Sequence, residues 1–159
     1  VVATAGTAEK LDRCRLLGAT MAVNYREEDF AGAVRQLSSG RGADVILDLV
    51  GARHWEKNVE CLREGGRLLV VGLVGGARVA ADLGLILRRR LQVIGTAMRA
   101  RSLEDKIEIT RRFAAGVLPL LKAREVKPVI DSVYPIEEVR AAHERMEANL
   151  NTGKIVLRM

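Results

Sequence analysis

Val1-Val2-Ala3-Thr4-Ala5-Gly6-Thr7-Ala8-Glu9-Lys10 joins an apolar run to a helical pattern through a single glycine, Gly6. A strand of a doubly wound parallel sheet passes into its helix in this way, and ligand-binding groups collect at the carboxyl ends of such strands. We therefore expect the residues around Gly6 to face a ligand.

The residues at this strand end also indicate which ligand it binds. In the second strand of a dinucleotide-binding sheet, an Asp or Glu here would bind the ribose 2′-hydroxyl, whereas a small residue with a nearby cation leaves room for a 2′-phosphate. Here Gly6-Thr7 ends the run, and Lys10 follows one helical turn later. If residues 1–5 are the second strand, the chain is expected to bind NADP(H).

Apolar runs and helical patterns alternate along most of the chain. We predict strands at 1–5, 21–24, 44–50, 67–71 and 91–96, and helices at 8–17, 27–38, 55–62, 80–90 and 102–115. Val45-Ile46-Leu47 is expected to be a continuous apolar core, and Glu64-Gly65-Gly66 to be a turn. Five strands alternating with helices predict an α/β protein with a Rossmann-type, doubly wound parallel sheet.

The pattern changes after Lys122. Residues 127–135 are extended and bounded by prolines, and residues 154–159 form a final predicted strand. Pro135 is expected to begin a helix whose apolar stripe includes Ala142 and His143, with His143 a hydrogen-bonded core residue. We therefore predict two domains, a dinucleotide-binding domain over 1–122 and a segment, 123–159, that returns to a neighbouring domain.

Composition argues against several classes of protein. The longest apolar stretch, 68–77, is about half the length that a membrane span needs. The net charge of +6 could attract nucleic acid, but five aromatic residues are too few for a base-stacking surface. Cys14 and Cys61 lie far apart without the paired spacing of a zinc site. They are expected to be reduced core thiols of a cytoplasmic protein.

The phosphate-binding loop of a dinucleotide fold is not found in this sequence. No G-x-G-x-x-G occurs, although in such folds that loop belongs to the first strand–helix unit and holds the pyrophosphate. Residues 1–5 do not fit as the first strand, because Gly6-Thr7-Ala8-Glu9 lacks the other glycines and puts Glu9 where a phosphate would lie. We therefore expect them to be strand 2 of the order 3-2-1-4-5-6, with a preceding unit of about 25–30 residues outside this segment.

Seven short motifs, spread in order over essentially the whole chain, resemble one known family. The motifs are Gly6-Thr7-x-x-Lys10, Asn24-Tyr25-Arg26-Glu27-Glu28-Asp29, Trp55-Glu56-Lys57-Asn58-Val59, Gly65-Gly66-Arg67, Tyr134-Pro135, Ala142-His143-Glu144 and Gly153-Lys154-Ile155-Val156-Leu157. They are similar to the zinc-independent quinone oxidoreductases, the zeta-crystallin-like branch of the medium-chain dehydrogenase/reductase superfamily, and most similar to the tumour-suppressor-inducible quinone oxidoreductases. The N-terminal catalytic domain and the glycine-rich unit of that family are missing.

This resemblance implies an NADPH-dependent reductase of quinones or related enones that forms a homodimer along the outer strand 91–96. It also implies that segment 123–159 belongs to a GroES-like catalytic domain, and that this portion alone is inactive. No catalytic residue is expected here, because the nicotinamide carries the hydride. The implied cofactor-binding residues are Gly6, Thr7, Lys10 and Tyr25 around the 2′-phosphate and ribose, Val50 and Gly51 beside the adenosine, and Gly72, Leu73, Val74, Gly75, Ile94, Gly95 and Thr96 toward the nicotinamide.

Two other functions stay open at this point. One is a 2-enoyl reductase of the same superfamily, as found inside multidomain synthases. The other is a non-catalytic nucleotide-binding or interaction module, which the missing catalytic half suggests. Single residues also have simpler interpretations: Lys10 could be a solvated charge, Tyr25 could cover the sheet edge, and Asp48 is expected to bond to backbone groups as a cap.

Overall fold

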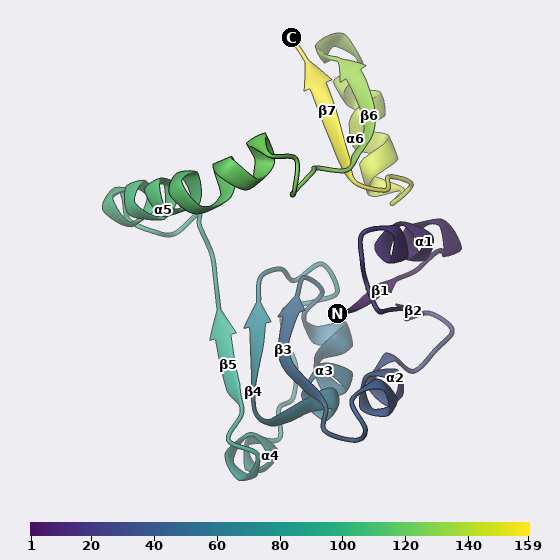
Figure 1. The fold of residues 1–159 in the computed structure, drawn as a ribbon, viewed down its shortest axis with the longest axis vertical. Coiled ribbons are helices and arrows are strands. Elements are labelled where there is room, and N and C mark those ends of the chain that lie inside the picture. The colour runs from purple at the N-terminus through teal and green to yellow at the C-terminus, as the bar shows by residue number, and fades with distance from the viewer. The chain divides into compact units, whose positions relative to one another are not determined.

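The computed structural model of the protein describes all residues, 1–159, and the chain forms two compact units, Val1–Ala100 and Arg101–Met159 (Figure 1). This division falls before the longest helix, whereas the sequence predicts a boundary after residue 122. The assignment of residues 101–122 to the dinucleotide-binding domain stays a prediction.

The first unit alternates strands and helices along the chain. Its elements are β1 Val2–Ala5, α1 Ala8–Leu16, β2 Met21–Asn24, α2 Phe30–Leu37, β3 Ala43–Asp48, η1 Ala52–His54, α3 Trp55–Cys61, β4 Leu62–Val70, α4 Leu83–Arg88 and β5 Gln92–Gly95. Every strand pairing is parallel, which confirms the predicted α/β class. The strands form two separate sheets, β1-β2 and β3-β4-β5, instead of one five-stranded sheet.

Side-chain caps fix where the helices of this unit begin. Thr7 caps α1 by accepting a hydrogen bond from the Lys10 N–H at 3.4 Å. Asp29 caps α2 by accepting from the Gly32 N–H at 3.0 Å, so α2 begins at Phe30 rather than at the predicted residue 27. Asp82 caps α4, which is therefore shorter than the predicted helix 80–90.

The predicted turn at Glu64-Gly65-Gly66 is wrong, because β4 runs through these residues. Ala43 of β3 pairs with Leu62, and Val45 pairs with Arg67, so residues 63–66 of β4 form a bulge opposite a single residue of β3. Gly65 has a φ of +69°, a conformation that glycine adopts without strain. The glycine pair therefore bends a strand instead of ending one.

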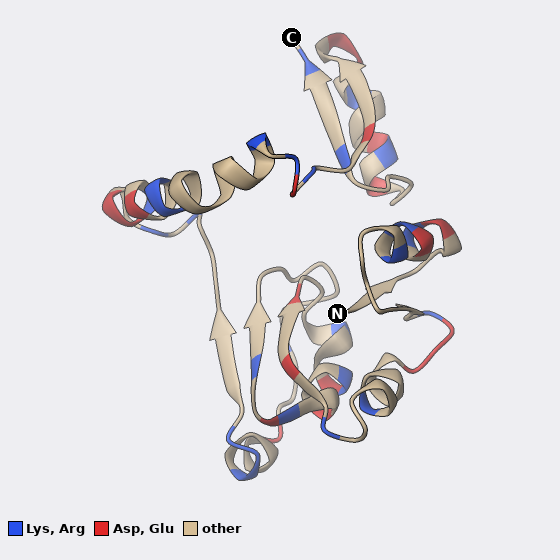
Figure 2. Cartoon of the chain, viewed as in Figure 1, with Lys and Arg blue, Asp and Glu red and all other residues tan.

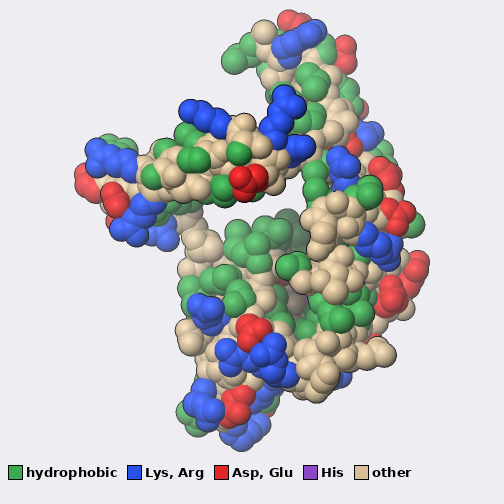
Figure 3. Space-filling view, in the orientation of Figure 1, with side chains coloured by type: hydrophobic (Ala, Val, Ile, Leu, Met, Phe, Trp, Pro, Cys, Tyr) green, Lys and Arg blue, Asp and Glu red, His purple; other side chains and the backbone are tan.

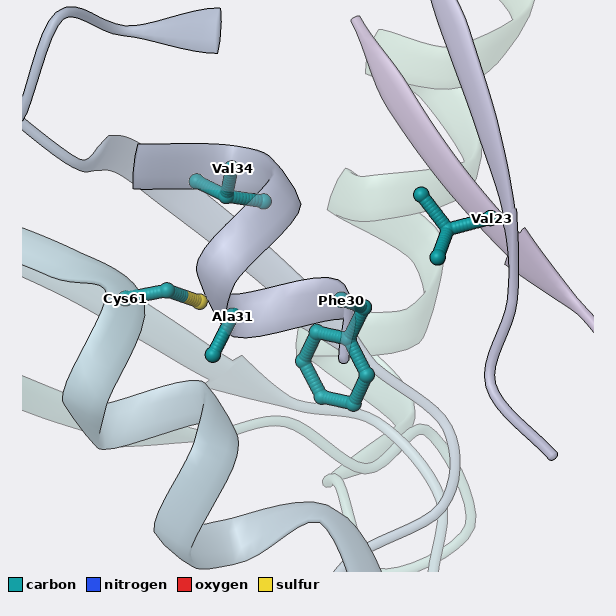
Figure 4. Packing of buried hydrophobic residues seen from close by; sticks show 5 residues of the cluster. All are labelled: Val23, Phe30, Ala31, Val34 and Cys61. Carbon is teal, nitrogen blue, oxygen red and sulfur yellow. The ribbon is translucent and has the colours of Figure 1, made fainter. Parts of the chain in front are cut away.

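Two apolar clusters hold the first unit together. Figure 4 shows the first cluster, in which side chains of α2 face Cys61 of α3, with Val23 from β2. The second cluster joins α3, β4 and the residue before β5, and Ile46 of β3 packs against both clusters. Charged residues lie mostly on helices and loops; β1, β2 and β5 carry none, whereas β3 and β4 together carry five (Figure 2). Burial raises the pKa of the Cys61 thiol to about 11, which keeps it protonated.

A groove separates the two sheets of the first unit. Residues 1–4 and 43–50 are among those that line its cavity of about 860 Å³. Strand β1 pairs only with β2, and β3 pairs only with β4, so each sheet has an unpaired edge strand at this cavity.

One face of β3 is exposed to solvent, contrary to the prediction. Val45, Leu47 and Leu49 are 43%, 65% and 56% exposed. The predicted continuous core of Val45-Ile46-Leu47 is therefore wrong, since only Ile46 packs against the core clusters. Hydrophobic side chains accordingly reach the surface of this unit (Figure 3).

The second unit contains one long helix and a two-stranded parallel sheet. Its elements are α5 Leu103–Lys122, β6 Ile130–Pro135, η2 Ile136–Glu138, α6 Val139–Glu147 and β7 Lys154–Arg158. Ser102 caps α5, as predicted, but the helix continues past the predicted end at 115. No helix of either unit is long and apolar enough to cross a membrane.

Asp131 joins the elements of the second unit. Its carboxylate accepts hydrogen bonds from Arg145 of α6 at 2.7 Å and from the Thr152 N–H at 2.8 Å. The Arg145 guanidinium holds the pKa of this carboxyl well below its usual range. His143 lies exposed on α6, so the predicted core histidine is wrong. Of the apolar stripe of that helix, only Ala142 is buried; Val139 is half-buried, and Met146 is exposed.

Candidate functional site

The carboxyl ends of β1 and β2 bring four of the predicted site residues together. Gly6 directly follows β1, and the Tyr25 N–H, directly after β2, donates to the Ala5 carbonyl at 3.2 Å. A Cβ atom on Gly6 would lie 2.9 Å from the Tyr25 hydroxyl oxygen, so the phenol lies directly against this strand end. Thr7 caps the helix whose first turn carries Lys10.

The turn after β2 is held in place by Asn24. Its side-chain oxygen accepts from the Arg26 N–H at 3.1 Å, and its own N–H donates to the Glu28 carboxylate at 2.9 Å. Asn24 is buried, and these bonds fix the direction of Tyr25. The positive end of the α1 dipole and the Lys10 ammonium favour an anion at this strand end.

The loops that follow β3 and β4 form a second group of predicted site residues. The Gly75 N–H donates to the Val50 carbonyl at 2.7 Å, and the Ala52 N–H donates to the Gly76 carbonyl at 2.9 Å. Gly51 has a φ of +80°, and a Cβ atom there would lie 2.6 Å from the Gly76 oxygen. The two loops therefore pack in direct contact, and only glycine fits at position 51.

Asp48 fastens both of these loops. Its buried carboxylate accepts from the N–H groups of Val50 at 2.8 Å and Gly51 at 3.1 Å. Its carbonyl accepts from the N–H groups of Val71 at 2.7 Å and Gly72 at 3.2 Å. The predicted role of Asp48 as a partner of backbone groups is confirmed, and it sets the shape of the sheet edge where the predicted site residues lie.

The remaining predicted residues lie exposed along the same edge of the three-stranded sheet. Gly95 pairs with Val70 in the β4–β5 ladder, and the Thr96 N–H donates to the Val70 carbonyl at 3.0 Å. A Cβ atom on Gly95 would meet no atom within 4 Å. Three apolar side chains stand nearby on β5 or on the loop after β4, those of Ile94, Leu73 and Val74.

His54 connects the two groups, a role that sequence reasoning missed. Its ring centroid lies 5.1 Å from that of Tyr25 and 5.3 Å from that of Phe30, and it ends η1 just after Gly51. Burial lowers the pKa of His54, which favours a neutral ring at pH 7. Nothing in the sequence pairs positions 25 and 54, because the contact depends on how α2 packs on α3.

Known proteins are similar to this chain in sequence. A family model described as "Zinc-binding dehydrogenase" matches residues 17–157. The chain is 29% identical to Quinone oxidoreductase 1 of Escherichia coli (strain K12), over 99% of this chain and 48% of that protein. It is 31% identical to 2-haloacrylate reductase of Burkholderia sp, over 99% of this chain and 47% of that protein. It thus spans about half the length of the curated relatives it matches.

Solved structures resemble this fold as well. The crystal structure of Escherichia coli quinone oxidoreductase complexed with NADPH superposes with a TM-score of 0.83 at 26% identity. The match covers 99% of this chain and 49% of that chain. The fold is therefore the nucleotide-binding, Rossmann-like fold of the medium-chain dehydrogenases/reductases.

The family description names zinc, and a zinc site has definite requirements. Three or four His, Cys, Asp or Glu ligands must converge at such a site. No group of three or more of these side chains in this chain could hold a metal ion. The residues present in this chain do not fit a zinc centre.

Proposed function

Because the chain belongs to the zinc-binding dehydrogenase family, we propose that it is the cofactor-binding portion of an NADPH-dependent oxidoreductase that reduces quinones or related enones. The proposal is supported by relatives that are quinone oxidoreductases and a 2-haloacrylate reductase, and by a similar structure that holds NADPH. The observation that carries it is the small, cation-flanked strand end at Gly6.

The arrangement of strands supports the assignment of β1 as the second strand. In the order 3-2-1-4-5-6, removal of strand 1 leaves the pairs 3-2 and 4-5-6. The observed sheets, β2-β1 and β3-β4-β5, have this order, and the groove lies between them. We propose that a strand–helix unit with the glycine-rich loop fills the groove and supplies the pyrophosphate site.

With β1 as strand 2, the adenosine end of the cofactor would lie against Gly6. The Lys10 ammonium and the Tyr25 hydroxyl would bind the 2′-phosphate, and β1 is followed by Gly6 instead of the Asp or Glu that would bind a ribose 2′-hydroxyl. Thr7 would contribute through the start of α1, and Val50 and Gly51 would lie beside the adenosine. This set of residues selects NADP(H) over NAD(H).

The nicotinamide end would lie along the exposed edge formed by residues 72–75 and 94–96. Gly72 and Gly75 let backbone approach the ligand, while Leu73 and Val74 offer apolar cover that excludes water. The bound cofactor supplies the hydride, and the protein orients it. The residues of this chain bind and orient, and substrate activation is left to another part of the full-length protein.

The relatives also support a class of substrate. Quinones and 2-haloacrylates share an electron-poor carbon–carbon double bond conjugated to a carbonyl group, which accepts hydride. Similarity to both kinds of enzyme supports a substrate of this class. A 2-enoyl reductase domain would act on the same type of bond, so substrate profiling of the full-length protein separates the two.

We also propose that β5 pairs with a second copy of the chain. All four residues of β5 are exposed, and its outer edge has no strand partner. An unpaired apolar edge favours pairing with another strand. Light scattering of the full-length protein at micromolar concentration should give the mass of a dimer, and a monomeric mass would contradict this proposal.

Lys10→Ala tests the cofactor assignment. The full-length protein should oxidise NADPH with a quinone as the acceptor, and it should prefer NADPH to NADH. Loss of the ammonium should reduce that preference by about tenfold or more, since a hydrogen bond to a charged group contributes about 1.5–3 kcal/mol. Steady-state kinetics with both dinucleotides measure the effect.

The control for Lys10→Ala is Arg13→Ala, which removes a cation from the last turn of the same helix. It should leave the NADPH/NADH ratio unchanged. An unchanged ratio in Lys10→Ala would exclude the phosphate assignment. Failure of the full-length protein to turn over any quinone or enone with NADPH would instead favour a non-catalytic module.

A further inference from the structure

Arg26 lies at the Gly6 strand end. It belongs to one of the seven sequence motifs, but it is not among the cofactor-binding residues that the resemblance implies. A Cβ atom on Gly6 would lie 2.7 Å from the Arg26 Nε, closer than it would lie to Tyr25. The Arg26 guanidinium carbon also lies 6.0 Å from the centroid of the Tyr25 ring. The strand end of β1 is thus covered by a phenol and a guanidinium that contact each other.

Two of the three carboxylates that follow Arg26 in the chain, those of Glu28 and Asp29, are engaged elsewhere. The charged turn after β2 changes from basic to acidic along its length (Figure 2). Glu28 accepts from the Asn24 N–H, and Asp29 caps α2 and pairs with Lys57 at 3.1 Å. The described contacts of Arg26 are its N–H bond to Asn24 and its contact with the Tyr25 ring. The N–H groups of the Arg26 guanidinium are therefore available to another acceptor.

Arginine at this position is suited to a dianion. The planar guanidinium can bind two phosphate oxygens at once, and it stacks on an aromatic ring without losing those donors. Lys10 lies in the first turn of α1, so each of the two elements that begin at this strand end, α1 and the turn after β2, carries a cation. A single ribose hydroxyl has no need of two positive charges.

We propose that Arg26 is a specificity-determining residue that binds the 2′-phosphate of NADP(H) together with Lys10 and is held over the site by Tyr25. The inference rests on the proposed function, because it concerns the same strand end. It adds a third side chain to that site and makes the turn after β2, not only the start of α1, responsible for the choice of cofactor.

Titration of the full-length protein with NADPH and with NADH, followed by cofactor fluorescence, tests this role. Arg26→Gln should weaken NADPH binding by about tenfold to a hundredfold, as expected for loss of a charged hydrogen bond. It should leave NADH binding within about twofold, the scatter expected for a surface change. Arg26→Lys should recover part of the NADPH affinity, because the charge returns without the bidentate geometry.

Arg41→Gln is the matched control. It removes the same charge from an exposed residue before β3, at the opposite end of the strands, and should change neither affinity. Equal losses for NADPH and NADH in Arg26→Gln would overturn the inference and leave Arg26 as a support of the turn. If the preference for NADPH over NADH falls in Lys10→Ala but not in Arg26→Gln, the inference about Arg26 is overturned and the proposed function stands. Wild-type protein that binds neither dinucleotide would overturn both.

Discussion

Leu47→Asp should have little effect on the stability of the 159-residue chain and should strongly destabilise the same protein when an upstream strand–helix unit is present. In this chain Leu47 is 65% exposed on the bare face of β3. A polar substitution at such a site changes the free energy of unfolding by about 0.5 kcal/mol or less. If a strand and its helix fill the groove, the same side chain is buried, and an unpaired carboxylate there costs about 3 kcal/mol or more.

Urea denaturation of both chain lengths, with and without the substitution, measures this difference. Leu87→Asp is the control, because Leu87 is 78% exposed on α4 and lies outside the residues that line the groove. It should be tolerated in both chain lengths. A loss for Leu47→Asp that is the same in both lengths would show that β3 is not covered by an added unit.

The sequence predicted the elements of the first unit well because their signals are local. The apolar runs predicted at 21–24 and 44–50 and the glycines after the strands depend on residues a few positions apart. The same holds for Asp48, whose side chain bonds two and three residues ahead. Strand ends therefore also gave most of the candidate site.

Features that depend on distant parts of the chain were not predictable in the same way. Val45-Ile46-Leu47 reads as a strand buried on both faces, but burial depends on what covers it, and only one face is covered. The exposure of His143 was not predictable for the same reason, because two strands bury only its neighbour Ala142. The His54–Tyr25 contact and the approach of Arg26 to Gly6 arise when separate elements pack, and no spacing in the sequence encodes them.

Gly51→Ala should both destabilise the first unit and weaken dinucleotide binding. Gly51 combines a φ of +80° with a ψ of −130°, a region that residues with a side chain avoid. The new Cβ would also overlap the Gly76 carbonyl oxygen at 2.6 Å, and backbone cannot move aside as a flexible side chain can. Together these effects should lower the free energy of unfolding by about 2–4 kcal/mol.

Gly40→Ala separates the cost of backbone strain from the cost of the overlap with the Gly76 oxygen. Gly40 also has a positive φ, +83°, but a Cβ atom there meets nothing within 4 Å. It should cost about 1–2 kcal/mol from backbone strain alone and leave NADPH affinity unchanged. Equal losses of stability in the two variants would mean that the loop after β4 yields to the new methyl group. Because the bonds of Val50 to Gly75 and of Ala52 to Gly76 align the two loops, a displaced loop should weaken NADPH and NADH alike, unlike the changes at Lys10 and Arg26.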